Sequence, residues 1–125
     1  MGASQFFTRA KGHTADEAFR SAQAEARHEH GLGGYTGTVA EKRAFRIIDA
    51  DREASALKRA LEAQPEDELA TKVIHDLDVL GAKRALAVAE AMLLLADARV
   101  DDKWGPSGCV RVDAETWLFF GWASC

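Results

Sequence analysis

Apolar and polar residues follow different patterns along the chain, and each pattern predicts a different kind of element. Residues 4–11 alternate loosely and contain Phe6 and Phe7, which predicts an N-terminal strand. Near the other end, residues 110–112 and 117–120 are rich in β-branched and aromatic side chains and flank a short turn, which predicts a closing β-hairpin. Between the two ends, apolar residues recur mainly at helical spacing.

A helix is predicted directly after the first strand. Thr14 and Glu17 have the spacing of a capping box, in which the threonine hydroxyl accepts from the Glu17 amide and the carboxylate reaches back to the Thr14 amide. Gly31 ends the helix in the usual glycine position. The apolar stripe of this helix is almost entirely alanine and consists of Ala15, Ala18, Phe19, Ala22 and Ala26.

The centre of the chain combines a strand-like segment with a longer helical one. Residues 38–40 and 44–48 predict either one long bulged strand or a tight hairpin that turns at 41–43. From Asp49 to Ala98 the pattern is helical. A first helix is marked by Ala54, Leu57 and Leu61. A second begins at Pro65 and the acids that follow it, with the stripe Leu69, Val73, Leu77 and Leu80. Gly81 either breaks or weakens the helix before a final one that contains Ala85, Leu86, Ala89, Leu93 and Ala96, which we expect to be the most buried.

These elements predict one α+β domain over residues 1–125, with a helical insertion at about 50–99. A small, mainly antiparallel sheet would hold the N-terminal strand, the central strand or hairpin and the C-terminal hairpin, with alanine-rich helices on one face. In the last strand, Trp117 and Phe119 share one face while Leu118 and Phe120 share the other, so both faces are apolar. The second face therefore needs either a second helical layer or another subunit, and we expect a homo-oligomer.

Composition narrows the class of protein. Apolar residues make up 47% of the chain, but 24 of them are alanine, so the larger apolar side chains are few. A net charge of −4 argues against duplex nucleic acid as a partner, because such binding depends on Lys and Arg. The most apolar stretch, 85–98, is too short to span a membrane and contains Glu90 and Asp97. With Cys109 and Cys125 expected to be reduced thiols, we expect a cytoplasmic protein.

The loop at residues 31–37 is the first candidate for chemistry, because it contains four glycines. Glycine lets backbone N–H groups converge on a phosphate. The loop lies between a helix end and a strand, whereas nucleotide-binding fingerprints join a strand to a helix start, so neither a P-loop nor a Rossmann turn applies. Two interpretations remain. One is a helix stop with a tight turn; the other is an unusual anion or nucleotide pocket, with Tyr35 for stacking and Lys42 and Arg43 for charge.

Other candidate residues give no enzymatic or metal signature. His28 and His30 lie two apart on a helix and point to nearly opposite sides, so we expect no metal site. Ser107 lacks the surroundings of a nucleophile turn. Glu41 and Glu115 are isolated carboxylates near turns. We therefore expect no cofactor and no catalytic residue.

Five short segments resemble a small, largely uncharacterised family of phage and prophage proteins: residues 17–20, 30–31, 34–42, 103–109 and 119–124. The helix and the Tyr-Thr-Gly-Thr segment after it are more distantly similar to phage anti-defence sponges of the Thoeris-inhibitor type. Those oligomeric α+β proteins sequester cyclic nucleotide signals without cleaving them. The helical segment between Asp49 and Ala98 has no counterpart in either pattern.

The resemblance implies a non-enzymatic phage or mobile-element protein in the host bacterial cytosol. It would sequester a cyclic nucleotide or another nucleotide-derived signal. The alternative hypothesis is a protein–protein inhibitor or assembly component that acts through its aromatic C-terminal hairpin. The candidate ligand-binding residues are Gly34, Tyr35, Thr36, Gly37, Thr38, Arg43, Lys103 and Trp104, with Arg43 or Lys103 as phosphate partners.

Overall fold

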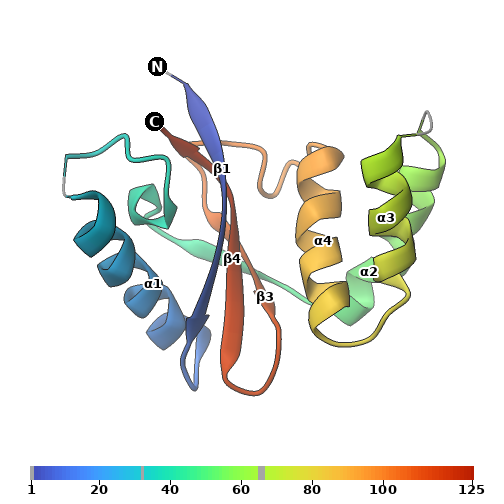
Figure 1. Ribbon diagram of the computed structural model, residues 1–125, viewed down its shortest axis with the longest axis horizontal. Coiled ribbons are helices and arrows are strands. Elements are labelled where there is room, and N and C mark those ends of the chain that lie inside the picture. Colours follow the sequence, from blue (N-terminus) through green and yellow to red (C-terminus); the bar gives the residue numbers. More distant parts are fainter. Residues whose placement is uncertain (1, 32, 65–66) are drawn as a thin grey trace.

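Four strands form a single mixed sheet in the computed structural model, which describes residues 2–31, 33–64 and 67–125 (Figure 1). The strand order is β1-β4-β3-β2, with β4 antiparallel to both of its neighbours and β2 parallel to β3. The predicted N-terminal strand, C-terminal hairpin and α+β class are confirmed. The strands are β1 (Ala3–Lys11), β2 (Phe45–Ile48), β3 (Ser107–Arg111) and β4 (Thr116–Ser124).

Helices cover both faces of the sheet, so the expectation of helices on one face was wrong. Helix α1 (Ala15–His30) lies on one side, and α2 (Ala50–Glu62), α3 (Glu68–Leu77) and α4 (Ala82–Leu94) lie on the other (Figure 1). Strand β4 serves both layers, because its side chains alternate: Phe119 joins the α1 core and Phe120 joins the α4 core. The second apolar face of the sheet is thus covered by the helices of the middle of the chain, which form the second helical layer that was one of the two predicted alternatives.

Helix α1 begins and ends where the sequence predicts. The Thr14 hydroxyl accepts from the Glu17 amide at 3.2 Å, and Gly31 ends the helix with φ of 82°. The Glu17 carboxylate, however, accepts from the amide of His13 at 3.0 Å, one residue before the expected donor. Ala18 is fully buried on the alanine stripe. This small side chain lets α1 lie close to the aromatic residues of β4.

The central segment forms neither a long strand nor a hairpin. Residues Val39–Glu41 make a short 3₁₀ turn, η1, and only Phe45–Ile48 enter the sheet, as the edge strand β2. The Thr38 hydroxyl accepts from the amide of Ala40 at 3.2 Å and so caps the turn. This local hydrogen bond competes with the strand preference of the β-branched residues.

The helical middle contains three helices, and Gly81 (φ of 85°) separates α3 from α4 rather than merely weakening one helix. The predicted start at Pro65 and Glu66 lies outside the described residues. Along the predicted α3 stripe, Val73 and Leu77 are buried, but Leu69 and Leu80 are exposed. Among the helices, α4 carries the most buried residues, as expected. In the described part of the chain, no helix is long and apolar enough to cross a membrane.

Candidate functional site

The candidate site is a hollow of about 820 Å³ at the end of the sheet where β4 finishes. Its wall combines the last turns of α1, the loop that follows α1, the η1 turn and the loop before β3. This volume lies within the range of about 300–1,000 Å³ that is usual for small-molecule sites. The lining residues are Gln23, Arg27, Gly34, Tyr35, Ala40, Glu41, Lys42, Arg43, Trp104 and Ser124.

Two aromatic side chains meet at the hollow from distant parts of the sequence. The rings of Tyr35 and Trp104 lie edge to face, with their centroids 6.3 Å apart. Both rings remain unusually open, at 52% and 63% exposure. Tyr35 adopts a left-handed backbone conformation, with φ of 55°, which is uncommon for a residue other than glycine. The pair therefore presents flat aromatic surface to solvent beside the hollow.

The cations around the hollow differ in what they contact. Arg27 and Arg43 line it and are exposed. Lys103 does not line it: its Nζ lies 5.4 Å from the centre of the Trp104 ring and donates to the carbonyl of Gly2 at 3.4 Å. Of the two predicted phosphate partners, Arg43 therefore faces the hollow and Lys103 lies behind Trp104.

Lys42 is buried and acts as a structural anchor. Its side chain is 3% exposed, and burial lowers its pKa, with the charge of Asp102 opposing that change. The ammonium group donates to three carbonyl oxygens of the loop before β3, those of Asp102 (3.1 Å), Lys103 (3.3 Å) and Gly105 (2.9 Å). Lys42 thus ties the loop that carries Trp104 to the segment that carries Glu41 and Arg43.

Thr36, Gly37 and Thr38 were predicted to bind the ligand, but they are not among the residues that line the hollow; they support the loop that carries Tyr35. The Thr36 amide and hydroxyl both donate to Glu41 Oε2, at 3.1 and 2.7 Å, and the two threonine hydroxyls lie 2.8 Å apart. The Gly37 amide donates to the carbonyl of Ser124 at 2.7 Å. Because these polar groups are already engaged, the three residues position the loop rather than present free donors.

The Glu41 carboxylate is the one acidic side chain among the lining residues. Burial favours its neutral form, but this is outweighed by hydrogen bonds from the side chain and backbone of Thr36 and from the backbone of Tyr35, with the charge of Arg27 adding to them. The pKa of Glu41 is consequently lowered from its ordinary value. The site therefore contains one fixed anion as well as its cations.

Ser124, Gln23 and Arg27 belong to the site, although none of them was predicted to bind the ligand. Ser124 is 1% exposed, and its Oγ has no hydrogen-bond partner within the described chain. Gln23 donates to the backbone carbonyls of Val39 and Lys42, which fixes η1 against α1. Gln23 directly follows Ala22 of the alanine stripe, and this position next to the apolar face could have indicated a buried polar side chain. In the sequence, Ser124 was noted only as the last residue of the resembling segment 119–124.

The residues considered for other chemistry have structural or solvent contacts. Ser107 is fully buried and donates to the carbonyl of Gly108 at 2.7 Å. Glu115 lies 3.7 Å from His13 at the exposed end of the β1–β4 pair. Across the described ranges, His, Cys, Asp and Glu side chains form no group of three that could hold a metal ion.

Comparison with known proteins adds no relative: no family model, curated protein or solved structure matches this chain. The functional interpretation consequently depends on the geometry of the hollow and on the sequence resemblance.

Proposed function

We propose that this protein binds a small nucleotide-derived anion in the hollow beside Tyr35 and Trp104 and holds it without turnover. The observation that carries the proposal is the convergence of two open aromatic rings with two exposed arginines and a buried, unpartnered serine hydroxyl. Each of these groups matches a different part of a nucleotide.

The aromatic pair supplies a stacking surface for a base. In proteins that bind single-stranded nucleic acids, base–aromatic stacking contributes about 1–3 kcal/mol per base by alanine substitution. An exposed Tyr35 and Trp104 can each lose solvent contact when a flat ring lies against them. Their edge-to-face arrangement also leaves the two rings non-parallel, at 84°, so one base would stack on only one of them.

Arg27 and Arg43 supply the charge for a phosphate. Guanidinium groups bind phosphate through paired, charge-assisted hydrogen bonds, and these are the stronger kind of hydrogen bond. The chain as a whole carries a net charge of −4, so the attraction must come from this local cluster. The Glu41 carboxylate opposes a highly charged anion, which favours a ligand with few phosphate charges.

Ser124 lines the hollow, and the described chain leaves the hydrogen-bonding capacity of its buried hydroxyl unused. A buried hydroxyl without a partner carries a desolvation cost of about 1–3 kcal/mol. A ligand hydroxyl, amino group or phosphate oxygen that bonds to Ser124 Oγ would remove this cost. Binding would therefore be stabilised by satisfying a group that the protein leaves unpaired.

The resemblance to phage proteins extends the proposal to biological role. We propose sequestration of a nucleotide signal in the host bacterial cytosol as an anti-defence activity, by a homo-oligomer. The alternative, an inhibitor that uses the aromatic hairpin, receives less support, because Trp117, Phe119 and Phe120 are buried between the two helical layers. Trp104, which precedes the hairpin, is the more exposed aromatic side chain and could contact a partner.

The proposal is tested by identifying what the protein binds. Purified protein is heated and the released small molecules are analysed by mass spectrometry. Calorimetric titration then uses cyclic mononucleotides and dinucleotides, with inorganic phosphate as the anion control. We expect Trp104→Ala to weaken binding about 5- to 150-fold, which corresponds to the stacking energy above. Ile47→Ala, which truncates an exposed apolar side chain on β2, is the matched control.

The arginines are tested in the same titration. Arg43→Ala should weaken binding of the nucleotides, whereas Arg20→Ala, on an exposed position of α1 about two turns before Arg27, should leave it unchanged. The absence of any released nucleotide together with no heat from any member of the panel would overturn the proposal.

A further inference from the structure

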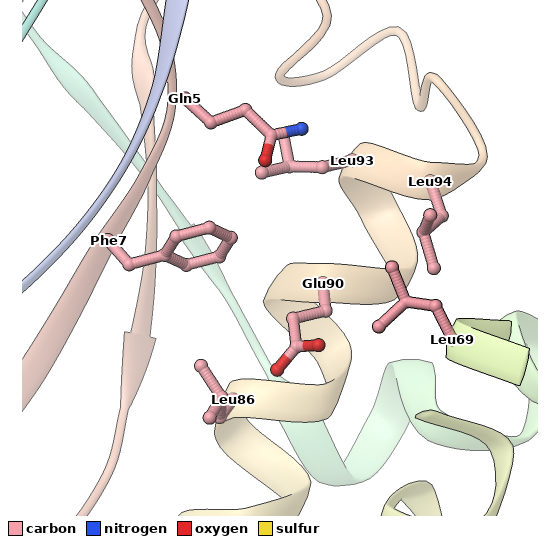
Figure 2. Close-up of a pocket in the computed structure, with 7 residues that line it drawn as sticks. All are labelled: Gln5, Phe7, Leu69, Leu86, Glu90, Leu93 and Leu94. Atoms are coloured by element: carbon pink, nitrogen blue, oxygen red, sulfur yellow. The ribbon is translucent and has the colours of Figure 1, made fainter. Parts of the chain in front are cut away.

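We infer that the free edge of β1 and the apolar groove beside it form the contact surface for a second copy of this chain. The groove has a volume of about 200 Å³ and runs between β1 and the helices α3 and α4 (Figure 2). It is separate from the hollow at Tyr35, so this inference does not depend on the proposed function. Its lining residues are Gln5, Phe7, Leu69, Leu86, Glu90, Leu93 and Leu94.

Strand β1 lies at the edge of the sheet, and no strand of the described ranges pairs with its outer side. Gly2 and Gly12 make their backbone hydrogen bonds with the β4 side, to Cys125 and Glu115. In an antiparallel pair these bonds alternate along the strand. The odd-numbered residues from Ala3 to Lys11 therefore direct their N–H and C=O groups to the open edge. A long unpaired edge of this kind is a template for another strand.

The odd-numbered side chains lie on the face of the sheet that carries the groove, and two of them, Gln5 and Phe7, line it. Phe6 and Ala10 belong to the α1 core, whereas Gln5 and Phe7 point toward α4 (Figure 2). Phe7 remains 42% exposed. This face of the edge strand thus places an incompletely covered aromatic ring, Phe7, next to free hydrogen-bonding groups.

The sequence of β1 fits a two-fold axis through Phe7, the middle residue of Ala3–Lys11. In an antiparallel pairing centred there, Phe7 faces Phe7 of the partner subunit, and all of the odd-numbered residues meet in hydrogen-bonded pairs. Arg9 lies opposite Gln5 and Lys11 lies opposite Ala3, so no two cations face each other. A register centred on Arg9 would bring like charges together, which is destabilising.

Charge also favours a second copy as the occupant. Glu90 lies in the groove among leucines, and burial raises its pKa despite the charge of Lys72. The described lining of the groove contains no cation. In the two-fold arrangement, Arg9 of the partner subunit enters beside Gln5, on the groove side of the sheet. It brings a guanidinium toward the Glu90 carboxylate, and the symmetric contact does the same on the other chain.

The other edge of the sheet offers no comparable surface. Strand β2 has four residues against the nine of β1. Short edge strands are one of the devices by which proteins avoid edge pairing. Ile47 on β2 is nonetheless 61% exposed, which makes this position a matched control.

The test is the mass in solution, measured by sedimentation equilibrium on the full chain from low micromolar to about 100 µM, because dimerisation depends on protomer concentration. We expect the wild type to reach twice 13.6 kDa. Phe7→Lys puts two cations face to face on the axis and should raise the dimer Kd by more than about 100-fold. Ile47→Lys should leave the dimer Kd unchanged. Far-UV circular dichroism establishes that each variant is folded.

A charge exchange tests the register. Arg9→Glu and Glu90→Arg should each weaken the dimer, and the double variant should restore much of the association. A monomeric wild type across the whole range would overturn the inference. So would a dimer that Ile47→Lys disrupts and Phe7→Lys does not, because the contact would then lie at β2.

Discussion

Replacing Lys42 by methionine tests how the two halves of the site are held together. The substitution keeps most of the aliphatic chain and removes the ammonium group that donates to the carbonyls of Asp102, Lys103 and Gly105. A hydrogen bond to a charged group contributes about 1.5–3 kcal/mol, but these contributions do not add fully. Water can also reach part of this loop once it is released. We therefore expect Lys42→Met to lower the free energy of unfolding by about 2–3 kcal/mol.

The assay is urea unfolding followed by circular dichroism. The midpoint should fall while the slope with denaturant stays the same, because the surface exposed on unfolding barely changes. Amide hydrogen exchange should become faster around Trp104, since its loop has lost the anchor. Lys83→Met removes an exposed lysine and should change stability by less than about 0.5 kcal/mol. A Lys42→Met protein as stable as this control would refute the anchoring role.

The pH dependence gives a second readout for Lys42. Its folded-state pKa lies below the ordinary value of 10.5, so between the two pKa values the unfolded chain binds more protons. The stability of the wild type should therefore include a component that rises with pH across that window toward 10.5. Lys42→Met should lack this component. An identical alkaline profile in the two proteins would contradict the burial of the charged group.

Three further predictions concern the loop and the cysteines. Gly37→Ala should lower the free energy of unfolding by about 1–3 kcal/mol in a thermal melt, because φ is 72° and the added Cβ would lie 3.1 Å from the Cβ of Cys125. The control is Gly33→Ala, whose added Cβ would meet nothing within 4 Å and which should be nearly neutral in the same measurement. Because the pKa of Glu41 is lowered, its ionised carboxylate should contribute fully to stability above about pH 4.5, and this contribution should be lost as the pH falls through the folded-state pKa. Glu41→Gln should therefore reduce the loss of stability at acid pH, measured by unfolding at a series of pH values. Burial raises the pKa of Cys109 to about 12, so a thiol reagent at neutral pH should modify only the exposed Cys125. Cys125→Ser should abolish the reaction. Rapid modification of both thiols in the native protein would contradict the burial of Cys109.

Local signals in the sequence predicted most of the elements. Thr14 and Gly31 mark the ends of α1 because capping is a short-range interaction. Loose alternation identified β1, and β-branched and aromatic runs around a turn identified the C-terminal hairpin. The layer arrangement was not predictable in this way. Periodicity shows that a helix has an apolar face, but it does not show which face of the sheet receives that helix. The 39–41 turn was also missed, because the Thr38 cap overrides the strand preference of its neighbours.

Of the residues that line the hollow, the predicted ligand-binding set contained Gly34, the two aromatic residues and Arg43, but not Arg27. The glycine-rich loop drew attention to Tyr35, the resemblance over residues 103–109 drew attention to Trp104, and the fold places these two rings side by side. The role of Lys42 depends on carbonyl groups about sixty residues further along the chain, so no local pattern could reveal it. The unpartnered Ser124 hydroxyl is likewise a product of tertiary packing.

The most direct test of nucleotide binding at the hollow is residue-resolved. A titration of ¹⁵N-labelled protein with cyclic mononucleotides and dinucleotides, followed by heteronuclear NMR, reports which amides respond. We predict that at least one nucleotide shifts the Tyr35 amide and the Trp104 indole resonances at stoichiometric concentration, with inorganic phosphate alone producing much smaller changes. Saturable shifts confined to other surfaces, or no shift with any member of the panel, would contradict it.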